Sequence, residues 1–93
     1  MSKNNEIENR RVSTFHNYPI KDDLLSVPGI NQSGINKLRR RCDIYTTNQL
    51  VGKFWMLDRN QIRFIEFLTE NVGIKYKFAK ECTENMTKKF RSM

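Results

Sequence analysis

The sequence predicts an all-α protein, a small five-helix domain that contains a helix-hairpin-helix motif. Apolar residues recur at intervals of three and four, which is helical spacing, and the alternation typical of strands is absent over any useful length. Leu, Ile, Val and Phe make up 24 of the 93 residues, enough for a hydrophobic core in a chain of one-domain size. We expect residues 8–93 to form this single helical domain.

The chain begins with a polar segment, and residues 1–7 are expected to be a mobile N-terminal tail. A first helix is predicted from Glu8 to His16, and Pro19 would end it because proline disfavours helical geometry in the preceding residue. The aspartates at positions 22 and 23 can each cap a very short helix that ends near Val27.

The stretch from Leu24 to Leu38 is the sharpest motif and predicts two helices joined by a very tight turn. Gly29 can adopt a positive φ without penalty, and Asn31 is among the few other residues that enter the left-handed region readily. Asn31 also opens a helix that runs to about residue 41. Ile30 would plug between the helices, while the amides of residues 29–33 could point at one phosphate. A purely structural helical turn is the alternative.

Two further helix starts follow. Thr46 to Gln49 has the pattern of a capping box and predicts a helix from Thr47 to Leu57. Asp58 to Gln61 repeats the pattern and predicts a helix from Arg59 to Asn71, which Gly73 would stop.

The final helix is predicted from Lys75 to Phe90. It carries one apolar stripe at steps of four residues, which we expect to pack inward, and several lysines off that stripe. The stripe consists of Phe78, Cys82, Met86 and Phe90.

Several kinds of chemistry are excluded. Cys42 and Cys82 form no CxxC pair, and His16 is the single histidine, so no zinc site, other metal site or cofactor is expected, and the thiols should be reduced and buried. No partner residue at a recognisable spacing assigns chemistry to His16. The longest apolar run, Phe54 to Leu57, is far too short to span a bilayer. We expect a soluble intracellular protein with no membrane insertion and no small-molecule substrate.

The charge favours a polyanionic partner. The net charge is +7, and residues 24–57 carry five basic side chains against one acidic side chain. Residues 58–93 carry eight against five, so the hairpin region and the last helix hold the excess. The run from Arg39 to Arg41 could alternatively be a solvated helix end that complements the helix dipole.

From Phe15 to about Phe90 the chain resembles the barrier-to-autointegration factor family. The resemblance runs through Phe15–Pro19, Gly29–Ile30 with Lys37–Leu38, Leu50–Phe54, Phe64–Leu68 and Gly73–Lys77 with Cys82 beyond. It implies a five-helix domain that forms a symmetric homodimer and grips and bridges double-stranded DNA without reading its sequence. It also implies a groove that receives LEM-domain proteins, and a location in the nucleus, at chromatin and the nuclear envelope, and in the cytoplasm.

The resemblance and the motif together give the candidate residues. The DNA-binding set is Arg11, Val27, Gly29, Ile30, Asn31, Ser33, Lys37, Lys77 and Lys80. The dimer or partner set is Val51, Gly52 and Phe54. Gly29→Glu is expected to abolish DNA binding and leave the helices intact, because it would place a side chain where a phosphate must lie.

The chain departs from the family in places that bear on regulation and assembly. The Ser/Thr-rich N-terminus of the family, a kinase target, is reduced to Ser2, and Arg10 to Ser13 has the pattern of a basophilic kinase site. The tryptophan of the family near the C-terminus is replaced around Lys88 to Phe90, and residues 59–63 lack the acidic stretch expected for LEM-domain binding. In the hairpin, Ile35 stands where a small residue is usual.

Two other functions compete with DNA bridging, an enzymatic one and one as a protein adaptor or competitor. Helix-hairpin-helix modules also occur in base-excision glycosylases, but this chain is too short to enclose a flipped base, so we expect no enzymatic activity. The second rival is a diverged relative that has lost bridging and acts as a protein adaptor or as a competitor with weak DNA binding, which the sequence leaves open.

Overall fold

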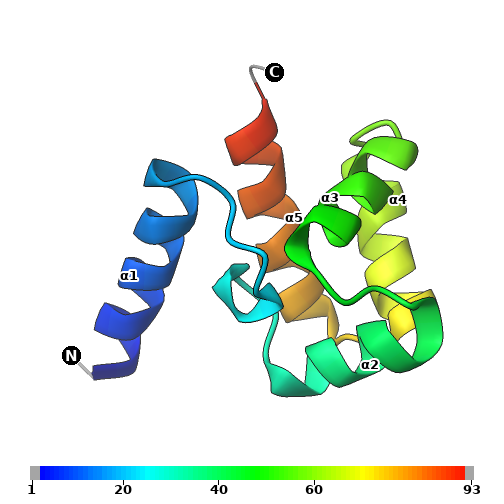
Figure 1. Cartoon of the computed structure of the whole chain (residues 1–93), viewed down its shortest axis with the longest axis horizontal. Coiled ribbons are helices and arrows are strands. Elements are labelled where there is room, and N and C mark those ends of the chain that lie inside the picture. Colours follow the sequence, from blue (N-terminus) through cyan, green and yellow to red (C-terminus); the bar gives the residue numbers. More distant parts are fainter. Residues whose placement is uncertain (1–2, 92–93) are drawn as a thin grey trace.

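The computed structural model describes residues 3–91, and side chains from Arg10 onward. All regular secondary structure in this part of the chain is helical and there is no strand, which confirms the all-α, five-helix prediction (Figure 1). Its elements are α1 (Lys3–Asn17), the 3-10 turn η1 (Leu24–Ser26), α2 (Gln32–Cys42), α3 (Thr47–Met56), α4 (Gln61–Glu66), the π-helical segment η2 (Phe67–Val72) and α5 (Tyr76–Phe90).

Helix α5 lies at the centre of the domain. It packs against α1 on one side and α4 on the other, while α2 packs against η2 along one edge of the molecule (Figure 1). Cys82, Met86 and Phe90 of its apolar stripe are buried, and Phe78 is partly buried against the core. The predicted inward face of the last helix is therefore confirmed.

Helix α1 is longer than predicted, because it begins at Lys3 rather than at Glu8. Residues 3–17 contain neither glycine nor proline, so nothing in this segment stops helix propagation toward the N-terminus. The helical assignment thus extends into the expected tail, whose mobility stays a prediction. The Lys89 ammonium donates to the Phe15 and Tyr18 carbonyls, which attaches the end of α1 to α5.

The two predicted capping boxes have different outcomes. At α3 the Thr46 hydroxyl accepts from the Gln49 amide, and the reciprocal bond from the Thr46 amide to Gln49 is present, as predicted. The box at Asp58 is wrong: Asp58 and Arg59 adopt left-handed φ angles of 59° and 55°. These two residues reverse the chain, so Asn60 becomes the N-cap of α4 and accepts from the Arg63 amide at 3.0 Å.

Both cysteines are free thiols. Burial raises the pKa of the Cys82 thiol to about 12, with a smaller contribution from Glu81. Cys42 is only half-buried, and burial raises its pKa as well. Both thiols are therefore protonated at neutral pH. Between residues 3 and 91, no helix has the combined length and apolarity that crossing a bilayer requires.

Candidate nucleic-acid interface

The turn before α2 requires a glycine at one position. Gly29 has a φ of 88°, in the region that only glycine adopts without strain. On either side, the Val27 amide donates to the Leu24 carbonyl and the Ile30 amide donates to the Val27 carbonyl, each at 3.1 Å. The Val27 and Ile30 side chains are fully buried, so Ile30 is the predicted plug. Ile35 is buried as well, and the helix before the turn is reduced to the single 3-10 turn η1.

Asn31 starts α2 but does not adopt the expected left-handed conformation. Its backbone is extended, with φ −109° and ψ −178°, and its side-chain oxygen accepts from the Gly34 amide at 2.9 Å. The reversal is already complete at Gly29, so Asn31 is free to serve as the N-cap, as predicted. The Ile30 amide is used within the turn, and the amides that can meet an anion include those in the first turn of α2, at Gln32 and Ser33.

Gly29 lies directly against the α5 backbone, and its predicted contact with a phosphate stays a prediction. A Cβ atom at this position would lie 2.5 Å from the Phe78 carbonyl oxygen and 2.8 Å from the Cys82 amide nitrogen. Both atoms belong to the α5 backbone and cannot move aside as a flexible side chain would. The absence of a side chain at Gly29 therefore lets the turn pack directly on α5.

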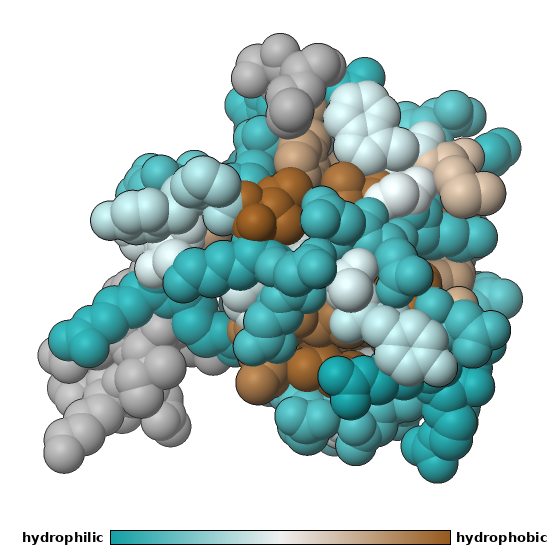
Figure 2. Space-filling view, viewed as in Figure 1, coloured by the Kyte–Doolittle hydropathy of each residue, from teal (hydrophilic) through white to brown (hydrophobic). Residues whose placement is uncertain are grey.

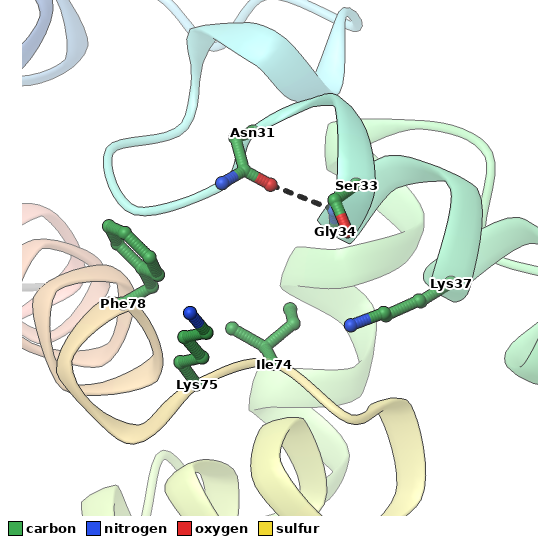
Figure 3. Close-up of a pocket in the computed structure, with 7 residues that line it drawn as sticks. All are labelled: Asn31, Ser33, Gly34, Lys37, Ile74, Lys75 and Phe78. Carbon is green, nitrogen blue, oxygen red and sulfur yellow. Dashed lines mark hydrogen bonds between the residues drawn. The ribbon is translucent and has the colours of Figure 1, made fainter.

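A hollow of about 190 Å³, here called the α2–α5 hollow, lies between the start of α2 and the start of α5. Lys37 and Lys75 extend toward it from opposite sides (Figure 3). Two helix N-termini converge here, each with unpaired amides and a partial positive charge, and no carboxylate lines the space. This arrangement suits a phosphate group. The lining residues are Asn31, Ser33, Gly34, Lys37, Ile74, Lys75 and Phe78.

Lys37 is held in place by the C-terminal end of η2. Its ammonium donates to the Gly73 carbonyl at 2.9 Å, and Arg41, one turn further on, donates to the Val72 carbonyl at 2.9 Å. Both cations thereby satisfy carbonyls at the C-terminus of η2, where positive charge is stabilising. Lys37 thus contributes charge to the hollow from a fixed position.

The start of α5 supplies one residue that the sequence analysis missed. Lys75 is exposed, lines the hollow and occupies the N-cap position of α5 without a capping side-chain bond. Lys77, which was predicted, is exposed in the first turn of α5, with its ammonium 5.0 Å from the centroid of the Phe78 ring. Lys80 is exposed further along α5 and does not line the hollow.

Arg11 connects α1 to the hairpin, and its predicted contact with DNA stays a prediction. One nitrogen of its guanidinium donates to three carbonyls of the hairpin, those of Leu25, Val27 and Ile30, at 2.9, 2.9 and 3.0 Å. Arg11 therefore fastens α1 to the back of the turn. The backbone amides and carbonyls of Val27 and Ile30 are all engaged within the protein, so these two residues shape the turn, and their predicted part in DNA binding stays a prediction.

The remaining candidate residues divide into surface and core. Gly52 is exposed, with nothing within 4 Å of an added Cβ, whereas Val51 is largely buried. Phe54 is fully buried and contacts Phe64 edge to face, with centroids 5.0 Å apart, so its side chain belongs to the core and not to an interface.

Ser13 is exposed on α1, where its hydroxyl accepts from Asn17, and its phosphorylation stays a prediction. Ser2 lies outside the described residues.

The chain is similar to one known protein family. The family model described as barrier to autointegration factor matches residues 7–93. No curated protein matches the chain. The family match spans nearly the whole chain and includes both helices whose N-termini form the α2–α5 hollow. The protein therefore belongs to the barrier to autointegration factor family, and its function is DNA-binding and related to chromatin.

Proposed function

We propose that this protein grips the sugar-phosphate backbone of double-stranded DNA without reading sequence, and that a homodimer bridges two duplexes. The observation that carries the proposal is the convergence of two helix N-termini and two lysines on the α2–α5 hollow, with no carboxylate among its lining residues. Backbone amides and lysines contact phosphates, which are the same in every sequence. The proposed location is the nucleus, at chromatin and the nuclear envelope.

Lys75→Ala and Lys77→Ala should each weaken duplex binding equally for unrelated sequences. Each change should also lower the magnitude of the salt slope, the dependence of log K on log salt concentration, by about one unit, because one phosphate contact and its released counterion are lost. Electrophoretic mobility shift or fluorescence anisotropy over a salt series measures this. Lys88→Ala is the matched control, since Lys88 is exposed at the opposite end of α5. A tenfold preference of the unmodified protein for one duplex sequence would contradict the proposal.

Bridging requires a second copy, because the described part of the chain has one such grip. We place the self-complementary surface on α3 around Gly52, where two backbones can approach closely. Trp55 and Met56 are exposed beside it, at 40% and 76%, and supply the apolar contact that Phe54 cannot. LEM-domain proteins are proposed to bind the groove that this dimer forms.

Gly52→Glu should convert the dimer to a monomer near 11.1 kDa, because it buries like charges against each other across the two-fold axis. Analytical ultracentrifugation at micromolar concentration measures the mass. Asn71→Glu, an exposed change of the same charge on η2, should remain dimeric. A monomeric mass for the unmodified protein would exclude the bridging model, whereas its DNA grip would be tested separately by the lysine variants.

A further inference from the structure

A second hollow lies at the other end of α2. It measures about 410 Å³ and is lined by Asn36, Arg39, Arg40 and Tyr45, with no carboxylate among them. We call it the Tyr45 hollow. Three of its lining residues belong to α2 and the fourth follows that helix. On the face shown in Figure 2, hydrophilic side chains cover most of the surface and apolar atoms lie deeper between them.

Tyr45 presents its ring from a fixed position. Its side chain is 52% exposed, yet its backbone is anchored on both sides. The buried Ile44 donates its amide to the Leu38 carbonyl at 3.1 Å, and the Tyr45 amide donates to the Gln49 side chain at 2.6 Å. The backbone that carries this exposed ring is therefore already ordered before a ligand binds, which lowers the entropic cost of binding.

The two arginines beside it have unused donors. Arg39 and Arg40 are exposed, and among residues 10–91, whose side chains the structure describes, neither guanidinium has a hydrogen-bond or ion-pair partner. Arg41 differs, because its guanidinium is occupied by the Val72 carbonyl. Arg39 and Arg40 are therefore not needed to satisfy the neighbouring helix end, and their planar guanidinium groups can donate to an anion such as a phosphate.

The Tyr45 hollow continues the α2–α5 hollow along one face of α2. Ser33 and Lys37 line the first, and Asn36 and Arg40 line the second. These four positions follow the i, i+3, i+4, i+7 spacing of a single helix face. From Ser33 to Arg40 the helix rises about 10 Å, roughly three nucleotides at 3.4 Å per nucleotide of strand. A strand held at the first hollow would reach the second within a few nucleotides.

We infer that the Tyr45 hollow binds unpaired nucleotides, so that the protein prefers duplexes with a single-stranded extension over blunt duplexes. Within a duplex the base faces are stacked on each other, whereas an unpaired base is free to stack on Tyr45 while its phosphates meet Arg39 and Arg40. An acidic peptide would satisfy the arginines, but the exposed ring and the continuity with the α2–α5 hollow favour nucleic acid. The inference rests on the proposed duplex grip.

The test compares a blunt duplex with the same duplex carrying a short 5′ or 3′ single-stranded extension, by fluorescence anisotropy at fixed salt. Affinity for one of the extended duplexes should be about tenfold higher, in line with the stacking of one base on an aromatic ring. Tyr45→Ala should remove this gain without changing the affinity for the blunt duplex. Tyr45→Phe should keep the gain, because the ring remains. Tyr18→Ala is the matched control, since Tyr18 is equally exposed but lies on the α1 side of the domain.

Equal affinity of the unmodified protein for blunt and extended duplexes would overturn the inference, and so would a gain that survives in Tyr45→Ala. Binding of a poly-glutamate peptide that Tyr45→Ala weakens, with no gain from an extension, would assign the hollow to an acidic protein segment instead. If the blunt duplex does not bind at all, the proposed duplex grip fails. A free single-stranded oligonucleotide whose binding depends on Tyr45 would still support the hollow in that case.

Discussion

Gly29→Glu is expected to destabilise the domain by about 4 kcal/mol or more, which is a large part of the stability of a typical small domain. Two causes combine. The φ of 88° is strained for any residue with a side chain, and the new Cβ would lie 2.5 Å from the Phe78 carbonyl oxygen. Neither the turn nor the α5 backbone can yield without separating the hairpin from α5. DNA binding should be lost with the fold.

Urea denaturation followed by far-UV circular dichroism measures this effect. Gly52→Glu is the matched control, because Gly52 adopts a helical conformation in α3 with open space around it. That control should unfold within about 1 kcal/mol of the unmodified protein when compared at a concentration where both are monomeric. A Gly29→Glu variant with an unchanged unfolding midpoint would show that the hairpin does not pack on α5 as described.

This result differs from what the sequence predicts for the same substitution, and the reason is physical. The local pattern around Gly29 indicates a positive φ, and that was correct. It carries no information on what packs against the turn, because α5 begins at Tyr76, far along the chain. The sequence motif therefore identifies the turn, but only the tertiary packing shows that its glycine faces the protein interior.

The helix ends also differ in how far the local sequence determines them. The Thr46 capping box involves only neighbouring residues, so its pattern was sufficient to predict it. The segment from Asp58 to Asn60 contains two residues able to cap, and the choice between them depends on how α3 turns back into α4. The Arg59 guanidinium stacks 4.7 Å from the Trp55 ring and donates to the Phe90 carbonyl, contacts that no local pattern encodes.

Charged residues were the hardest to assign from the sequence. Arg11 and Lys75 are both basic, and their patterns do not distinguish a cation that binds backbone carbonyls from one that faces solvent. The structure separates them, since the Arg11 guanidinium is bonded to the hairpin and Lys75 lines the α2–α5 hollow. Its position at the start of the predicted last helix was the one signal for Lys75, because a helix N-terminus favours anions.

Ser33→Glu should abolish most duplex binding while leaving the domain folded, with an affinity loss of about 100-fold. Ser33 is exposed in the first turn of α2 and lines the α2–α5 hollow, so a carboxylate there would repel the phosphate that we propose to bind. The same carboxylate is favourable for the helix, because negative charge stabilises a helix N-terminus. Binding and folding should therefore respond in opposite directions, which Gly29→Glu cannot achieve.

The matched control is Gln61→Glu, which adds the same charge to the first turn of another helix, α4, at an exposed position away from the hollow. Fluorescence anisotropy with a blunt duplex should show near-normal affinity for Gln61→Glu and about a 100-fold loss for Ser33→Glu. Both variants should unfold at or slightly above the midpoint of the unmodified protein. If Ser33→Glu binds the duplex as tightly as Gln61→Glu does, the phosphate does not enter the α2–α5 hollow, and the basic surface must engage DNA elsewhere.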